Sequence, residues 1–111
     1  MIPAYAVKHD RPPIFRGDTL QPMSVTITVD ETPLIPDFVC AQVRAAYGTV
    51  VYQYEPIIED GRVILGEIPA EVTSKFKSGT YRYDIEYRMP DGYVRTFVTG
   101  NIYIIEDTSR C

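Results

Sequence analysis

The stretch Thr80-Tyr-Arg-Tyr-Asp-Ile-Glu-Tyr-Arg88 decides the fold class. Large apolar residues at positions 81, 83, 85 and 87 alternate strictly with charged residues at positions 82, 84, 86 and 88. A period of two places the aromatic side chains on one face of a β-strand and the charged side chains on the other. The stretch therefore predicts a half-buried strand whose tyrosine-rich face lines a core.

The residues that follow predict a hairpin. Asp91-Gly92 is a strong short-range signal for a hairpin, and it leads into a second β-rich run at residues 93–98. The run resumes at residues 101–105, after Gly100. A single glycine inside a strand pattern favours a bend or bulge, so we expect one at Gly100.

The residues upstream predict further short strands. Residues 23–29 alternate apolar and polar side chains. Residues 38–47 also suit a helix by propensity, but we assign a strand because apolar residues at 39, 41, 43 and 45 then share one face. Residues 50–54 and 62–65 follow, with turn signals at Gly48-Thr49 and Asp60-Gly61. Residues 69–76 predict one or two helical turns that start at a proline.

This pattern predicts an all-β fold, an immunoglobulin-like antiparallel β-sandwich with seven or eight strands. Ser78-Gly79-Thr80-Tyr81 suits a tyrosine corner, in which the hydroxyl of a tyrosine bonds to the backbone upstream. Tyr83 stands where an antibody domain carries its second cysteine, and the chain has no tryptophan. The prediction is therefore a sandwich outside the true antibody type.

Three prolines set the expected domain boundaries. Pro3, Pro12 and Pro13 extend the backbone and oppose both helix and central strand, which predicts an extended N-terminal arm at residues 1–13. The sandwich is expected at residues 14–108 and a short tail at residues 109–111. Cys40 is expected in the core and Cys111 in the tail, so we expect reduced thiols rather than a disulfide.

Composition excludes several function classes. The 111 residues include 45% apolar and 23% charged residues and carry a net charge of -4, so we expect one self-folding domain without nucleic-acid binding. Apolar runs are far shorter than the roughly 20 residues of a membrane span. The N-terminus lacks the pattern of a secretory signal. We therefore expect no membrane partner and synthesis in a cytoplasm.

The residues give little support to catalysis or metal binding. The single histidine, His9, lies in the predicted arm, and Cys40 and Cys111 have no histidine at ligand spacing. We therefore expect no enzyme activity, no small-molecule substrate, no metal and no cofactor. Arg16-Gly17-Asp18 matches a tripeptide that integrins bind, but a turn capped by the aspartate is the favoured interpretation.

Tyrosine is the one functional enrichment, with nine residues in 111. A small sandwich has too little interior for all of them, and surface tyrosines are favoured at protein interfaces. The candidate partner-binding residues lie in the arm and on the later strands: Ile2, Tyr5, Val7, Tyr52, Tyr54, Tyr93 and Tyr103.

The order of the motifs resembles a group of small phage and prophage proteins. The matching motifs are Phe15-Arg-Gly-Asp-Thr19, Gln42-Val-Arg44, Ile68-Pro-Ala70, Ser78-Gly-Thr-Tyr-Arg-Tyr-Asp-Ile-Glu86, Asp91-Gly92 and a closing strand with Gly100. These proteins are similar to the immunoglobulin-like N-terminal domain of the siphophage upper baseplate protein. The resemblance spans residues 14–108. The proline-rich arm departs from it.

The resemblance implies a non-enzymatic virion structural or adaptor protein of the tail, baseplate or neck. Its partners would be other virion proteins, with copies of itself as a further candidate, and its location would be the virion. Two alternatives stay open: a capsid decoration protein, and a carbohydrate- or receptor-binding module that presents Arg16-Gly17-Asp18. We also expect the arm, residues 1–13, to be dispensable for folding and to dock onto a neighbouring subunit.

Overall fold

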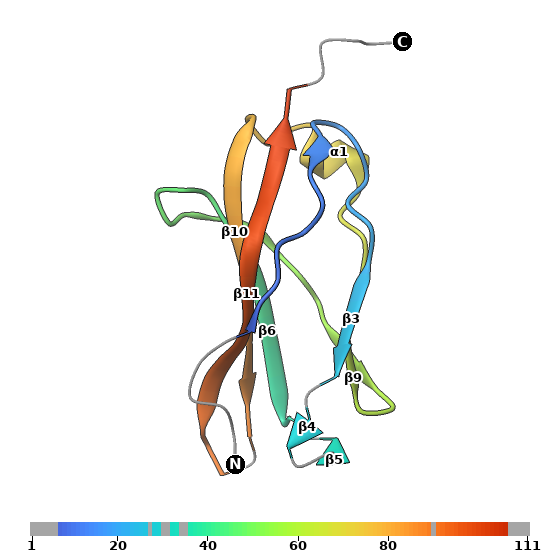
Figure 1. Ribbon diagram of the computed structural model, residues 1–111, viewed down its shortest axis with the longest axis vertical. Coiled ribbons are helices and arrows are strands. Elements are labelled where there is room, and N and C mark those ends of the chain that lie inside the picture. Colours follow the sequence, from blue (N-terminus) through green and yellow to red (C-terminus); the bar gives the residue numbers. More distant parts are fainter. Residues whose placement is uncertain (1–6, 27, 30–31, 34–35, 90, 107–111) are drawn as a thin grey trace.

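The computed structural model describes residues 7–26, 28–29, 32–33, 36–89 and 91–106. These residues form two β-sheets that face each other, a small two-stranded ribbon and one short helix (Figure 1). The long strands lie along the long axis of the molecule. This arrangement confirms the predicted all-β, immunoglobulin-like sandwich.

The larger sheet has the strand order β1-β11-β10-β6-β7, and β2 also pairs with β11. Neighbouring strands are antiparallel, except that β1 and β2 run parallel to β11. The strands span Val7–Lys8 (β1), Ile14–Phe15 (β2), Phe38–Arg44 (β6), Val50–Gln53 (β7), Gly79–Arg88 (β10) and Val94–Ile105 (β11).

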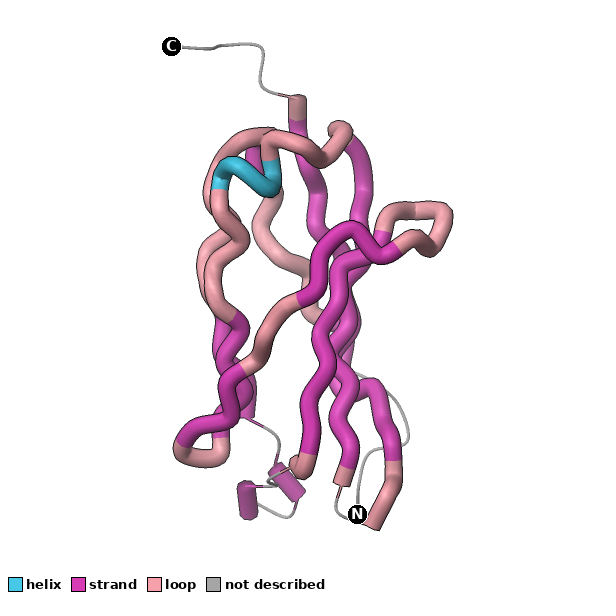
Figure 2. Tube along the Cα trace, turned by 180° about the vertical axis from the view of Figure 1, so that it is seen from behind, coloured by secondary structure: helices cyan, strands magenta, loops and turns pink. Residues whose placement is uncertain are grey.

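The smaller sheet has the order β3-β9-β8 and is antiparallel throughout. Figure 2 shows the chain crossing from β7 of the larger sheet to β8 of the smaller one. The strands span Met23–Thr26 (β3), Ile57–Glu59 (β8) and Arg62–Leu65 (β9). The separate ribbon pairs Thr28–Val29 (β4) with Thr32–Pro33 (β5), and the helix α1 spans Ala70–Thr73 directly after Pro69, as predicted.

The core lies between the two sheets and follows the predicted alternation. Tyr81, Tyr83, Ile85 and Tyr87 of β10 are all buried, while the charged residues between them face outward or are half-buried. In β6 the odd positions from 39 to 43 are buried in the same way. The smaller sheet contributes buried apolar side chains from β9, chiefly Val63 and Leu65.

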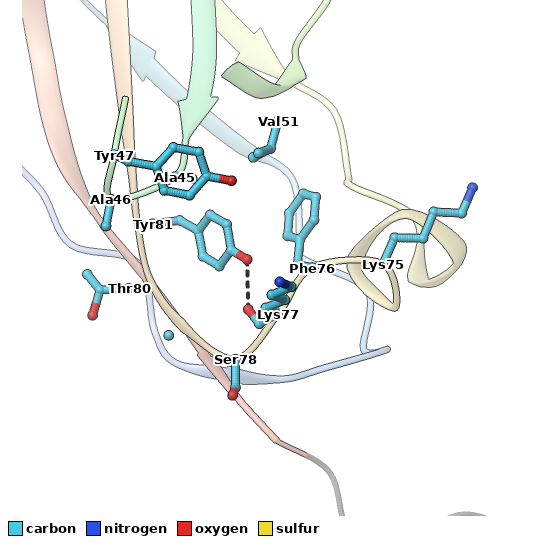
Figure 3. A pocket seen from close by; sticks show the side chains of 11 residues that line it. Ala45, Ala46, Tyr47, Val51, Lys75, Phe76, Lys77, Ser78, Thr80 and Tyr81 are labelled. Atoms are coloured by element: carbon cyan, nitrogen blue, oxygen red, sulfur yellow. Dashed lines mark hydrogen bonds between the residues drawn. The ribbon is translucent and has the colours of Figure 1, made fainter. Parts of the chain in front are cut away.

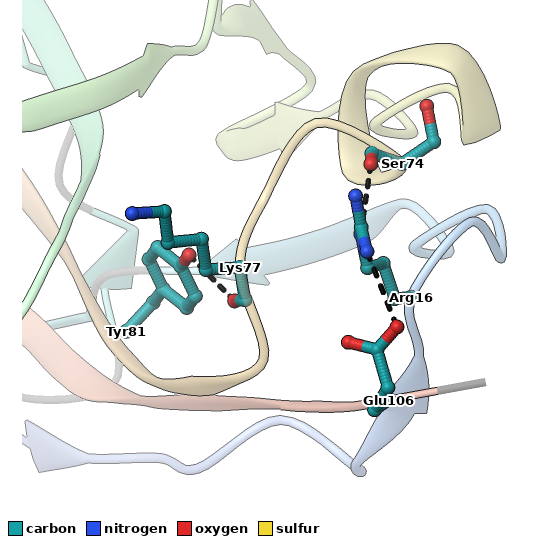
Figure 4. Close-up of polar contacts among 5 residues, drawn as sticks. All are labelled: Arg16, Ser74, Lys77, Tyr81 and Glu106. Atoms are coloured by element: carbon teal, nitrogen blue, oxygen red, sulfur yellow. Dashed lines mark hydrogen bonds and ion pairs between the residues drawn. The ribbon is translucent and has the colours of Figure 1, made fainter. Parts of the chain in front are cut away.

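The predicted turns and the tyrosine corner are confirmed. Asp60 and Gly61 both adopt positive φ, at 50° and 73°, as a tight two-residue hairpin turn requires. At the second hairpin Asp91 accepts a hydrogen bond from the Tyr93 N–H at 3.1 Å. The Tyr81 hydroxyl donates to the carbonyl of Lys77 at 2.7 Å (Figure 4), which ties β10 to the loop that precedes it.

The bulge expected at Gly100 lies elsewhere. Gly100 pairs regularly with Tyr83, and the register slips instead between Val98 and Thr96, opposite Ile85 and Glu86. Gly100 serves a different purpose, because a Cβ at this position would overlap the backbone carbonyl of His9. The glycine therefore permits close approach of another backbone segment, the other common reason for glycine in a strand.

That segment corrects the expected arm. Val7 and Lys8 form β1, and the His9 and Arg11 N–H groups continue the pairing by donating to Thr99 and Asn101 carbonyls at 2.8 and 2.9 Å. The two adjacent prolines at 12 and 13 follow these donors, so they interrupt none of these bonds. The fold thus begins before residue 14. Residues 1–6 and the tail at 109–111 lie outside the described residues.

Cys40 also differs from the expectation of a core residue. It is only partly buried and lies on the outer face of β6, opposite Glu86 of β10. The strand period explains this position, because residue 40 has the opposite parity to buried Val39 and Ala41. Partial burial raises the pKa of the Cys40 thiol, and the charge of Glu86 adds to the rise. Cys111 lies outside the described residues.

Candidate docking surfaces

The predicted docking tyrosines have different surroundings. Tyr54 is a core residue, only 5% exposed, which corrects its assignment to partner binding. Its N–H donates to the Ala41 carbonyl at 2.9 Å, just beyond the end of β7. Burial raises the pKa of Tyr54 to about 12, although the nearby charge of Arg11 lowers it. Tyr52 is partly buried and packs edge-on against Tyr54, with ring centroids 5.3 Å apart.

The remaining candidates do not form one site. Tyr93 is 57% exposed at the β10–β11 turn. Tyr103 is 37% exposed near the other end of β11, opposite Thr80, and its hydroxyl accepts a hydrogen bond from Asn101 at 3.2 Å. Val7 is placed by its backbone pairing in β1, and Ile2 and Tyr5 lie outside the described residues.

Exposed apolar residues lie on both faces of the β10–β11 hairpin end. Phe38, Tyr93 and Val94 are 51%, 57% and 52% exposed. Phe38 pairs across the sheet with Arg88, and Arg88 pairs with Val94, so these three residues form one row on the outer face. Tyr93 directly precedes Val94 and stacks with Arg95, which pairs with Tyr87, so Tyr93 lies on the other face of the hairpin. We call Phe38, Arg88, Tyr93 and Val94, the residues of both faces, the hairpin-end surface.

Two arginines organise this surface. The Arg88 guanidinium lies over the Phe38 ring, 5.1 Å from its centroid, and contacts Asp37 at 3.6 Å. The guanidinium of Arg95 lies 5.6 Å from the Tyr93 ring centroid. Stacked arginine and exposed aromatic rings are features of the central residues of protein interfaces.

Sequence reasoning named Tyr93 as a candidate but did not name Phe38 or Val94. The sequence did indicate that Phe38 faces outward, because it is an even number of residues away from the outward residues Gln42 and Arg44 of β6. An apolar residue at an outward position is the pattern that could have marked it. Val94 could not be found this way, since its row partner depends on the register between β10 and β11.

A pocket of about 350 Å³ lies at the opposite end of the larger sheet (Figure 3). Tyr47 at its mouth is 82% exposed, and Phe76 and Tyr81 stack inside with centroids 5.1 Å apart. The Tyr81 hydroxyl is engaged with the Lys77 carbonyl, and burial raises the Tyr81 pKa. The Lys75 side chain extends away from the pocket. These walls suit apolar or ring contacts rather than proton transfer.

The Arg16-Gly17-Asp18 segment forms the predicted turn, closed by the Asp18 N–H donating to the Phe15 carbonyl at 3.0 Å. The main chain of Asp18 closes the turn, in place of the expected side-chain cap. The Arg16 guanidinium makes two contacts (Figure 4). Its Nε donates to the Ser74 carbonyl at 2.9 Å, and its Nη1 pairs with Glu106 at 3.2 Å. The tripeptide thus fastens the turn to the loop after α1 and to the end of β11.

The described residues contain no group of three or more His, Cys, Asp or Glu side chains that could hold a metal ion. His9, the single histidine, accepts a hydrogen bond from the Tyr83 hydroxyl through its backbone carbonyl. Within the same described ranges, no helix has the length and hydropathy that crossing a membrane requires.

Comparison with known proteins shows the fold and nothing finer. No protein-family model matches the chain, and no curated protein matches it. Among solved structures, CopC from Methylosinus trichosporium OB3b superposes with a TM-score of 0.58 at 8% identity, covering 93% of this chain and 91% of CopC. A fibronectin(III)-like module of Clostridium thermocellum CbhA is also similar, with a TM-score of 0.43, 14% identity and coverage of 93% and 92%.

Proposed function

We propose that this chain is a non-enzymatic docking protein of a bacteriophage virion, a structural or adaptor component of the tail, baseplate or neck. The docking role rests on the hairpin-end surface, where Phe38, Tyr93 and Val94 are each about half exposed. The virion setting rests on the order of motifs between residues 14 and 108. Its partners are other virion proteins.

The chemistry of the hairpin-end surface supports protein rather than nucleic-acid or sugar partners. Burying apolar area contributes about 25 cal/mol per Å², so half-exposed Phe, Tyr and Val side chains gain most against another apolar surface. Arg88 and Arg95 are already aligned on the rings of Phe38 and Tyr93, which lowers the entropy lost on binding. Asp37 sits beside Arg88, so the surface also presents a carboxylate that would repel phosphate.

The absence of catalysis is part of the same proposal. In the described part of the chain, the buried titratable side chains are chiefly tyrosines, and burial raises the pKa values of Tyr54, Tyr81, Tyr83 and Tyr87. A phenol with a raised pKa is a poor general base at neutral pH. This supports a structural use of the tyrosine face.

Incorporation into particles tests the docking role. Particles formed with tagged chain carrying Tyr93→Ser and Val94→Ser are expected to contain at least tenfold less of it than particles formed with the tagged parent. Tyr47→Ser is the matched control, because Tyr47 is even more exposed and follows the end of β6 that lies away from Phe38. Equal incorporation of the double variant would show that docking uses another surface.

The pocket beside Tyr47 favours one alternative, a carbohydrate-binding module. Sugars stack on exposed aromatic rings, and Tyr47 is an exposed ring in the lining of this pocket. Titration of the purified chain with glycans decides between the two functions: the docking proposal expects no binding, while binding that Tyr47→Ala abolishes would replace it. Receptor binding through Arg16-Gly17-Asp18 has less support, because the Arg16 side chain already bonds to Ser74 and Glu106.

A further inference from the structure

The larger sheet has an edge that is only partly covered. β7 pairs with Gln42, Val43 and Arg44 of β6. The chain then turns away at Tyr54 and crosses to the smaller sheet (Figure 2). Among the described residues, no strand pairs with β6 on this side over residues 38–40. Half of a long strand in the larger sheet thus has an open edge.

The backbone of Val39 faces this open edge. In an antiparallel sheet, successive residues direct their N–H and C=O groups to opposite sides of the strand. Val43 pairs with Tyr52, and the Ala41 carbonyl accepts from the Tyr54 N–H on the β7 side. Val39 has the same parity, so its N–H and C=O point to the uncovered side. An extended segment placed there would continue the sheet.

A groove lies along this edge, between the two sheets. Its volume is about 320 Å³. One wall comes from the start of β6 and the other from the crossing segment and β8, and the apolar lining residues are Phe38, Val39, Tyr54, Pro56 and Ile58. Asp37, Gln53 and Glu55 form its polar rim. The groove suits an uncharged, extended peptide with apolar side chains on one face.

We propose that residues 1–6 of one copy add to this edge of β6 in a second copy. The segment, Met1-Ile-Pro-Ala-Tyr-Ala6, carries no charged side chain, in a chain that is 23% charged. Ile2 supplies an apolar anchor, and Ile2 and Ala4 share one parity, so both can direct their N–H groups to β6. Pro3, which lacks an N–H, then faces the outer edge, where proline is tolerated.

Residues 1–6 are too short to pair in the groove of their own chain, so the groove accepts the segment of a second copy. One row of paired residues crosses the larger sheet: Val7, Val98, Ile85 and Ala41. β1 lies at one end of this row, and β6, with its open edge, lies at the other. Four strand spacings of about 4.8 Å separate β1 from a strand added beyond β6, roughly 19 Å in all. Six extended residues span about 20 Å, so the crossing would use the whole segment and leave none to pair.

The contact is head-to-tail, because the donor segment and the acceptor edge are different surfaces of the chain. Contacts of this kind close into rings or extend into filaments. The inference rests on the proposed docking function and names a second copy as one partner. Phe38 belongs to both surfaces, but Tyr93 and Val94 lie outside the groove lining, so particle incorporation of the Tyr93→Ser and Val94→Ser variant tests the docking role separately.

Complementation between two variants tests the exchange. A chain lacking residues 2–6 keeps the groove but loses the donor, and Ile58→Arg keeps the donor but places a charge in the groove. In native mass spectrometry the parent is expected as dimers and larger species, each variant alone as monomer, and their equimolar mixture as heterodimer only. Ile57→Arg is the matched control, because Ile57 is 57% exposed and has the opposite parity in β8, and it should assemble like the parent.

A second readout does not depend on the folding of Ile58→Arg. A synthetic peptide of residues 1–7, added to the chain lacking residues 2–6, is expected to shift the backbone amide resonances of Val39 and Ile58 and to leave that of Tyr103 unchanged. A parent chain that stays monomeric at 100 µM or more, assembly that survives the deletion, or a peptide without effect on these amides would each overturn the exchange. If the self-exchange fails in one of these ways but the chain still enters particles, the docking function stands without the exchange.

Discussion

At the residue scale, three side-chain donors bond to backbone carbonyls of segments outside the central strands. Tyr81 donates to Lys77 four residues upstream, and Tyr83 donates to His9 in the N-terminal segment at 2.5 Å. Arg11, only 7% exposed, donates to the Gln21 carbonyl at 2.7 Å. Each bond satisfies a buried or half-buried polar group, so each is expected to contribute measurably to stability.

Removal of the Tyr81 hydroxyl tests the corner. Tyr81→Phe keeps the stacked ring but leaves the Lys77 carbonyl without its donor, which should lower the free energy of unfolding by about 1–2 kcal/mol. Urea unfolding measures the change. Tyr47→Phe, at an exposed position, should stay within about 0.5 kcal/mol of the parent. Equal stability of Tyr81→Phe and the parent would mean that the corner bond contributes nothing.

Gly100 tests the close approach of the N-terminal segment. Gly100→Ala would force the added methyl group against the His9 carbonyl and the Tyr83 ring, and the expected cost is about 1–3 kcal/mol or more. Gly66→Ala is the matched control, because a Cβ at that position meets no atom within 4 Å. The comparison is made by thermal unfolding. Similar melting temperatures for the two variants would contradict the packing of residue 9 on β11.

Alkaline pH tests the burial of Tyr54. Its pKa is raised to about 12 from 10.0, so the folded state favours the neutral phenol. The resulting stability is fully present below pH 10 and is lost as the pH rises from 10 to 12, by up to about 3 kcal/mol. Thermal unfolding of the parent and Tyr54→Phe across this range measures the difference. A parent no more sensitive than Tyr54→Phe would contradict the assignment.

Pairing between distant segments controls stability at the scale of elements. β1 and the residues after it form an edge of the larger sheet, since His9 and Arg11 donate to β11 and Asp10 accepts from the Asn101 N–H at 2.9 Å. This edge covers β11 over Val98 to Asn101. The N-terminal segment beyond residue 6 is therefore a structural element of the sandwich.

Truncation separates this element from the residues before it. Deletion of residues 2–11 should lower the melting temperature by at least 10 °C, because Tyr83 loses its acceptor and Arg11 its buried contacts. Deletion of residues 2–6 alone should change it by no more than about 2 °C at dilutions where the parent is also monomeric. Differential scanning calorimetry gives both values. An unchanged midpoint for the longer deletion would restore the original expectation that the whole arm is dispensable for folding.

The elements also show what the sequence could and could not predict. The strands β6 and β10 were predictable because their alternation is local, and the Asp60-Gly61 and Asp91-Gly92 turns carry local signals. The position of β1 was not, because the acceptors of its hydrogen bonds are about 90 residues away. The bulge opposite Ile85 depends on the register of two strands, which neither strand encodes alone.

For the candidate site too, the sequence predicts what local signals determine and misses what strand pairing determines. Tyr93 was predictable because a residue beside a turn signal is exposed. Tyr54 was misassigned because residues 50–54 alone do not show which of their faces is buried; the pairing with β6 places Tyr54 beside Ala41, on the inner face that Tyr52 shares. Phe38 and Arg88 meet only through the pairing of β6 with β10.

At the scale of the whole molecule, the three candidate surfaces lie at different places on the sandwich. The hairpin-end surface lies at one end, the pocket beside Tyr47 at the other, and the open edge of β6 between the sheets. Such a chain can contact several neighbours at once, which suits a component of a symmetric particle. The net charge of -4 favours solubility before assembly.

The most direct test of the central claim is the amount of the untagged chain in purified particles. Particles released after prophage induction are banded by density, and the chain is quantified by mass spectrometry against the major capsid protein. The docking account predicts a fixed ratio across independent preparations, retained after washing in 1 M salt because apolar contacts dominate the hairpin-end surface. A chain found only in the soluble fraction, or removed by the salt wash, would contradict the account.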